Sequence, residues 1–132
     1  PLGSVYQAGT LSGNPCAVAA GIATLKQIES TPDIYEALDK KSAVLEEAMK
    51  SAGLNVNRCG SLMTVFFNSK KVVSYDESRA CDTEKYAEYY RHLLRNGIYA
   101  APSQFEAMFV SYAHTAEDIE RTAEIIKAFN GE

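Results

Sequence analysis

The most informative segment of the sequence is residues 6–15, Tyr-Gln-Ala-Gly-Thr-Leu-Ser-Gly-Asn-Pro. It predicts a glycine-punctuated loop with two hydroxyl side chains that leads into a helix, because Asn14 can cap a helix and Pro15 suits the first helical position. Free backbone N–H groups, hydroxyls and the positive end of a helix dipole together suit an anion. An ordinary capped loop would have the same residues, so the pattern alone leaves both interpretations open.

The helix after this loop is predicted to run from Pro15 to about Glu29. Its apolar residues point all round the helix: Cys16, Val18, Ala20, Ile22, Leu25 and Ile28. A helix that is apolar on every side is normally buried on more than one side. One small domain cannot cover it, so we expect other parts of a larger protein to do so. By itself, the chain is expected to self-associate.

The rest of the chain alternates between amphipathic helices and short strands. Apolar spacing predicts helices at residues 33–52, 83–96 and 115–129. Runs of β-branched and aromatic residues predict strands at residues 56–58, 63–67, 98–100 and 108–110. The polar segment 68–81 is predicted to be irregular. Together these elements predict one α+β domain, residues 5–132, with a short, mostly antiparallel sheet covered by helices.

The composition is that of a globular protein and argues against nucleic-acid and membrane partners. Hydrophobic residues make up 46% of the 132 residues and charged residues 23%. The net charge of -4 gives no basic footprint for nucleic acid. The longest apolar run, residues 16–23, is too short to span a bilayer.

The cysteines predict neither a disulfide framework nor a zinc site. Cys16, Cys59 and Cys81 are odd in number and form no C-x-x-C pair. Reduced thiols fit a cytoplasmic location. Residues 1–4, Pro-Leu-Gly-Ser, are interpreted as the remnant of an expression tag. The native N-terminus then lies outside this sequence, so a plastid location also stays open.

A second loop with chemical potential, residues 101–107, joins two predicted strands and reads Ala-Pro-Ser-Gln-Phe-Glu-Ala. Its carboxylate, Glu106, is either solvated or partly desolvated and usable for handling a proton or an amine. Of the two histidines, His92 is predicted to be solvated on its helix. His114 is predicted to orient the turn before the last helix.

These stretches resemble the glutamate-1-semialdehyde 2,1-aminomutase family, within the class III pyridoxal-phosphate aminotransferases. The matching motifs are Y-Q-A-G-T-L-S-G-N-P at residues 6–15, G-S-L-M at 60–63, A-P-S-Q-F-E-A at 101–107 and F-V-S-Y-A-H-T-A-E-D-I at 109–119. The likeness covers nearly all of residues 5–129 in the right order. It implies that the chain is the C-terminal part, including the small domain, of a fold-type-I enzyme that is normally a homodimer.

The resemblance also implies an activity and a set of site residues. The family converts glutamate-1-semialdehyde into 5-aminolevulinate, the precursor of tetrapyrroles, with pyridoxal phosphate as cofactor. By resemblance, Gly9 and Thr10 would reach the cofactor phosphate of the neighbouring subunit, and Glu106 would face the active-site entrance and the substrate.

The catalytic lysine and the aspartate that pairs with the pyridinium nitrogen would lie upstream of Val5 in this family. None of the eight lysines in the sequence lies in the apolar setting that a Schiff-base lysine needs. The chain alone is therefore expected to be inactive and to bind no cofactor.

Two alternatives stay open at this point. One is a segment of another class III aminotransferase, such as an ω-amino-acid aminotransferase, against which the Ser103–Glu106 loop argues. The other is a stand-alone interaction or ligand-binding module. The tag remnant directly before a motif from the middle of an enzyme argues against that interpretation.

Overall fold

A computed structural model of the chain describes residues 3–5, 8–68 and 70–129. The chain divides into two compact units, Pro1–Ile34 and Tyr35–Glu132. Each unit is described by itself. Among the described residues, every helix is too short or too polar to cross a membrane.

The first unit contains helix α1 (Pro15–Glu29) and the loop before it. The predicted start of the helix is confirmed: Pro15 is at its first position, and the Asn14 side chain accepts a hydrogen bond of 3.1 Å from the Ala17 amide. No side chain of α1 is buried. The cover that its all-round apolar surface requires is therefore not supplied by residues of the first unit.

The second unit is built on a three-stranded antiparallel sheet in the order β1-β2-β3, as the sequence predicted. Its strands are β1 (Asn55–Cys59), β2 (Leu62–Phe66) and β3 (Met108–Phe109). Residues 60–61 form the tight turn between β1 and β2, and Gly60 there has a φ of 57°. Glycine adopts this left-handed conformation without steric cost.

The predicted strand at residues 98–100 is wrong, because these residues follow directly from a helix end. The Ile98 amide donates to the Leu93 carbonyl at 2.9 Å, and the Gly97 amide donates to the Leu94 carbonyl at 3.0 Å. This pair of bonds, with Gly97 at a φ of 83°, is a Schellman motif that closes helix α4 (Thr83–Arg95). The Ile98 amide is thus used by the helix and is unavailable to a sheet.

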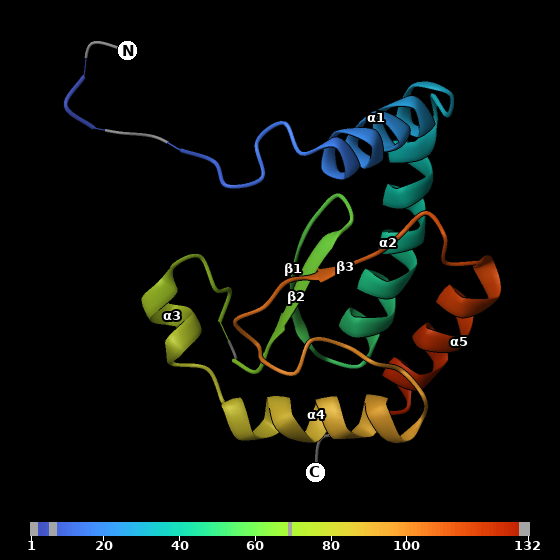
Figure 1. The fold of residues 1–132 in the computed structure, drawn as a ribbon. Coiled ribbons are helices and arrows are strands. Elements are labelled where there is room, and N and C mark those ends of the chain that lie inside the picture. The colour runs from blue at the N-terminus through green and yellow to red at the C-terminus, as the bar shows by residue number, and fades with distance from the viewer. Residues whose placement is uncertain (1–2, 6–7, 69, 130–132) are drawn as a thin grey trace. The chain divides into compact units, whose positions relative to one another are not determined.

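Three helices pack against one face of the sheet: α2 (Ile34–Ser51), α4 (Thr83–Arg95) and α5 (Ala116–Lys127) (Figure 1). Their apolar stripes meet β2 in one core. That core contains Leu45, Ala48, Met49, Met63, Val65, Tyr86, Tyr89, Leu93, Val110, Ile119, Ala123, Ile126 and Phe129. The predicted α+β class, a short antiparallel sheet covered by helices, is confirmed.

The sequence predicted an irregular segment after β2, and this prediction is wrong in part. The segment contains the short helix α3 (Tyr75–Arg79). A capping box between Ser74 and Glu77 starts this helix. Before it, the Val72 carbonyl accepts a 2.7 Å hydrogen bond from the Asn57 side chain on β1. Val72 also packs with Phe66 and Cys81 in a small second core.

Candidate functional site

The loop before α1 forms a compact turn. The Ser12 amide donates to the Gly9 carbonyl at 3.0 Å, and the Asn14 amide donates to the Leu11 carbonyl at 3.0 Å. A side chain at position 9 would place its Cβ only 2.1 Å from the Ser12 hydroxyl oxygen, so Gly9 makes room for that hydroxyl. Thr10 is exposed on the turn. This arrangement is compatible with the anion site predicted for this loop and with an ordinary capped loop, so the anion site stays a prediction. Tyr6 and Gln7 lie outside the described residues.

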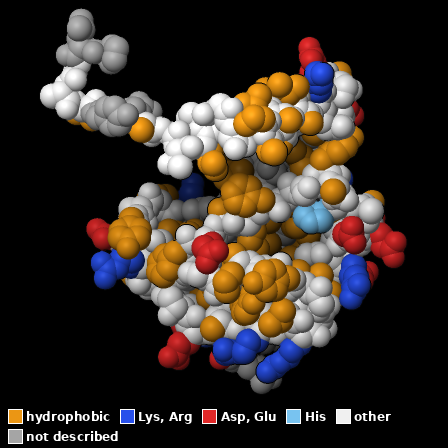
Figure 2. All heavy atoms as spheres, viewed as in Figure 1, with side chains coloured by type: hydrophobic (Ala, Val, Ile, Leu, Met, Phe, Trp, Pro, Cys, Tyr) orange, Lys and Arg blue, Asp and Glu red, His pale blue; other side chains and the backbone are white. Residues whose placement is uncertain are grey.

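A pocket of about 520 Å³ opens in the second unit among α2, α4, α5 and residues 98–109. Its wall is mostly apolar and includes residues of the core. Glu106, His114, Asp118 and Thr122 are among its polar lining residues. Figure 2 shows hydrophobic, acidic and histidine side chains together on the face of this unit that is in view. Glu106, which the sequence singled out, therefore lines a pocket of the size and apolar character of small-molecule sites.

Two side-chain hydrogen bonds fix the loop at residues 101–107 to the rest of the second unit. The Tyr86 hydroxyl donates to the Ala101 carbonyl at 2.8 Å, and the Gln104 side chain, only 2% exposed, donates to the Ser78 carbonyl at 3.1 Å. Burial, reinforced by the Glu106 carboxylate, raises the pKa of Tyr86 to about 12, so its hydroxyl keeps its proton and donates. With the loop fixed in this way, the exposed Glu106 side chain is free to meet a ligand.

His114 shapes the turn between β3 and α5, as predicted. Its Nδ1 accepts a 3.0 Å hydrogen bond from the Ser111 amide, which places the proton of the neutral ring on Nε2. The same turn is held by Lys41, whose ammonium donates to the carbonyls of Tyr112 at 2.9 Å and His114 at 2.6 Å.

The prediction that His92 is solvated is wrong. Its ring lies 5.5 Å from the Phe129 ring, and its Nε2 is 2.8 Å from the Ile125 carbonyl at the end of α5. The side chain is half-buried because it faces α5 rather than solvent.

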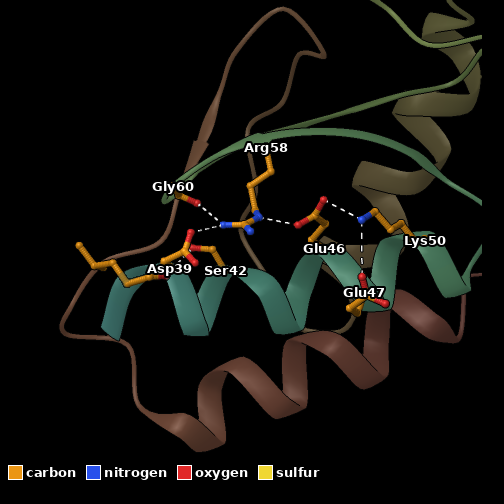
Figure 3. Close-up of polar contacts among 8 residues, drawn as sticks. Asp39, Ser42, Glu46, Glu47, Lys50, Arg58 and Gly60 are labelled. Atoms are coloured by element: carbon orange, nitrogen blue, oxygen red, sulfur yellow. Dashed lines mark hydrogen bonds and ion pairs between the residues drawn. The ribbon is translucent and has the colours of Figure 1, made fainter. Parts of the chain in front are cut away.

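The sequence did not predict the network of charged side chains that joins β1 to α2 (Figure 3). Arg58 donates from Nε to Glu46 at 2.5 Å, and from Nη1 to Asp39 at 2.6 Å and to the Gly60 carbonyl at 2.9 Å. These hydrogen bonds, the one to Asp39 first, raise the pKa of Arg58. An arginine inside a predicted strand could have suggested such partners, but not which helix supplies them.

The Arg58 network is also connected to β3, the strand that follows the loop at residues 101–107. Through the Gly60 carbonyl it holds the turn between β1 and β2. In the next residue, the Ser61 carbonyl accepts a 3.0 Å hydrogen bond from the Val110 amide, directly after β3. The network thus anchors the sheet on which the loop at residues 101–107 is mounted.

The described residues supply no lysine to the pocket wall. All eight lysines are exposed except Lys41, which is half-buried and bonded to two carbonyls. Among the same residues, no group of histidine, cysteine and acidic side chains could hold a metal ion.

Comparison with solved structures defines the class of protein. A β-phenylalanine aminotransferase from Variovorax paradoxus matches 96% of this chain with 30% of its own, at a TM-score of 0.76 and 27% identity. A structure described as a transaminase with PLP bound matches 93% of this chain with 28% of its own, at a TM-score of 0.64 and 26% identity. No protein-family model matches the chain. The fold is that of a segment of the pyridoxal-phosphate transaminases.

Sequence comparison narrows this class. Glutamate-1-semialdehyde 2,1-aminomutase from Desulforamulus reducens is 53% identical over 98% of the chain and 31% of its own length. The enzymes of the same name from Clostridium acetobutylicum and Syntrophus aciditrophicus are each 49% identical, over 96% and 99% of the chain. The chain spans about a third of the length of these relatives. Over nearly its whole length the chain is therefore similar to a segment of the glutamate-1-semialdehyde 2,1-aminomutases, as its motifs predicted.

Proposed function

We propose that this chain is part of a cytoplasmic, homodimeric enzyme that converts glutamate-1-semialdehyde into 5-aminolevulinate in tetrapyrrole biosynthesis. The observation that supports this most strongly is its 43–53% identity, over nearly its whole length, to enzymes named for that reaction. The solved transaminases are far less similar, at 21–27% identity. This difference favours an aminomutase over an ω-amino-acid aminotransferase.

In this proposal, the loop before α1 contributes to a cofactor phosphate site. The residues present fit that part of pyridoxal phosphate: Gly9 and Thr10 lie on an exposed turn, with the N-terminus of α1 close behind in the chain. The Thr10 hydroxyl and backbone amides of the turn would donate to phosphate oxygens. By the family resemblance, the phosphate belongs to the neighbouring subunit, so each subunit would complete the other's site.

Glu106 would act on the substrate side. Its carboxylate is exposed, at the edge of the pocket, on a loop that Tyr86 and Gln104 hold in place. A carboxylate so placed can hold a substrate ammonium group or move a proton at its Oε atoms. Bound pyridoxal phosphate supplies the electron sink that an amino-group transfer between neighbouring carbon atoms requires.

The Schiff-base lysine would come from outside this sequence. No described lysine lines the pocket, and the half-buried Lys41 is held by two backbone carbonyls. A Schiff-base lysine needs an apolar pocket, which none of these positions provides. The chain alone is therefore proposed to be inactive.

An exchange experiment tests the proposal. This chain would replace the corresponding third of the Desulforamulus reducens aminomutase, and the chimera would be assayed with glutamate-1-semialdehyde and with ω-amino acids. We expect formation of 5-aminolevulinate. Borohydride reduction and peptide mapping should find the cofactor-modified lysine outside the exchanged segment. A folded chimera that only transaminates ω-amino acids, or a stoichiometric adduct on one lysine of this chain, would refute it.

A further inference from the structure

All three methionines of the chain line the pocket of the second unit: Met49 from α2, Met63 from β2 and Met108 from β3. Methionine is flexible and polarisable, so methionine-rich walls adapt to apolar ligands of varied shape and make favourable contacts with aromatic rings. The neighbouring wall residues are also mainly apolar, among them Leu45, Leu93, Ile119 and Ile126. The interior of the pocket therefore suits an apolar, ring-sized body.

Tyr89 adds one polar group to this wall. It is fully buried, it lines the pocket, and its hydroxyl has no hydrogen-bond partner among the described residues. Burial raises the pKa of Tyr89, so the hydroxyl stays protonated and can donate. A buried hydroxyl without a partner is unfavourable, and a ligand group that bonds to it would remove that cost.

Two acidic side chains, Glu106 and Asp118, line the pocket. His114 lines it too, and among the described residues no lysine or arginine does. Hydrogen bonds from Thr115, first from its backbone amide, lower the pKa of Asp118, which is therefore ionised at neutral pH. An anionic ligand would meet these carboxylates without a compensating lysine or arginine.

We propose that this pocket is a binding site for a small, neutral aromatic molecule with one hydrogen-bonding group. The ring would contact the three methionines, and the polar group would bond to the Tyr89 hydroxyl. The pocket volume, about 520 Å³, lies in the range of small-molecule sites. The proposed ligand shares this pocket with the Glu106 carboxylate that the proposed function assigns to the substrate, but its test measures binding to this chain and not the aminomutase reaction.

Methionine-methyl NMR of the chain tests the proposal directly, since every methionine signal reports on this pocket. The probes are p-cresol, toluene and p-toluate, which share a methyl-substituted ring and differ in the second group. We expect p-cresol to shift the methionine signals at the lowest concentration and p-toluate to bind most weakly. In Tyr89→Phe, affinity for p-cresol should fall roughly three- to tenfold, while affinity for toluene should not change.

Two further variants locate the binding. Ala100→Leu puts a larger side chain on the pocket wall and should weaken p-cresol binding. If this variant does not fold, Thr122→Leu on α5 tests the same point, because Thr122 also lines the pocket. Val44→Leu, exposed on α2 and away from the pocket wall, is the matched control. Methionine signals that p-cresol does not move, equal p-cresol affinity in Tyr89→Phe, or equal weakening in the Val44 control would each overturn the proposal.

Discussion

Arg58 on β1 and Glu46 on α2 are joined by a 2.5 Å hydrogen bond from Nε to the carboxylate, and both side chains are only 18% exposed. The other ion pairs found among the described residues have at least one side chain farther out in solvent; in the Lys40–Glu36 pair, for example, the side chains are 73% and 67% exposed. Because exposed pairs contribute little to stability, the pair between Arg58 and Glu46 is the one that should matter for the fold.

Arg58→Met should destabilise the second unit. The substitution keeps an apolar stem over the sheet but leaves Glu46 and Asp39 without this donor. Hydrogen bonds to charged groups typically contribute about 1.5–3 kcal/mol, and we expect the free energy of unfolding to fall by about that amount in urea denaturation. Glu47→Gln, which removes an exposed ion pair with Lys50, should change it by less than about 0.5 kcal/mol. An equal loss of unfolding free energy in both variants would mean that the Arg58 network does not stabilise the fold.

The same pair predicts a dependence of stability on pH. Hydrogen bonds from Lys50 and Arg58 lower the pKa of Glu46 below its ordinary 4.5. A carboxyl whose pKa is lower in the folded state stabilises fully above its unfolded-state pKa and loses this contribution as pH falls through the folded-state value. Unfolding midpoints in urea should therefore drop as the pH falls below 4.5. The drop should be shallower in Glu46→Gln; parallel curves for both proteins would contradict the role given to this carboxylate.

Thr10→Val, made in the chimeric enzyme, should weaken retention of pyridoxal phosphate. It removes the hydroxyl but keeps the branched shape of an exposed loop residue. A hydrogen bond to a charged phosphate contributes about 1.5–3 kcal/mol, so the dissociation constant should rise roughly 10- to 100-fold. Thr10→Ser keeps the hydroxyl and should bind nearly as the parent does. An unchanged dissociation constant for Thr10→Val would mean that this turn is an ordinary capped loop without a role in cofactor binding.

The chain alone should self-associate through α1. This helix carries exposed Val18, Ile22 and Leu25, and none of its side chains is buried. Sedimentation over a dilution series should show a mass that rises with concentration. Leu25→Glu should reduce this rise, whereas Leu94→Glu, an exposed leucine on α4, should leave it in place. A chain that stays monomeric at every concentration would rule out this role for α1.

Local signals in the sequence predicted most of the fold. Asn14 and Pro15 set the start of α1, and the Thr115–Asp118 capping box sets the start of α5, because both act within one turn of a helix. The wrong strand at residues 98–100 arose because β-favouring residues follow Gly97. Whether they pair in a sheet depends on where the Ile98 amide bonds, which is a matter of the helix end.

The site was less accessible to sequence reasoning. Glu106 could be singled out from its loop, but the hydrogen bonds that hold this loop, from Tyr86 and Gln104, join residues 15 and 26 positions apart in the chain. The Arg58 network likewise joins a strand to a helix 12 and 19 positions away. Contacts of this range depend on how the elements pack, which local periodicity does not encode.

In the proposed enzyme, the loop at residues 101–107 contributes the Glu106 carboxylate to the aminomutase reaction. The most direct measurement is the rate of 5-aminolevulinate formation by the chimera with and without Glu106→Gln, which keeps the shape of the side chain and removes its charge. We expect kcat to fall roughly 100-fold or more, as for loss of a group that transfers protons, with the unfolding midpoint unchanged. A variant that turns over at the parent rate would show that Glu106 is only a solvated surface carboxylate.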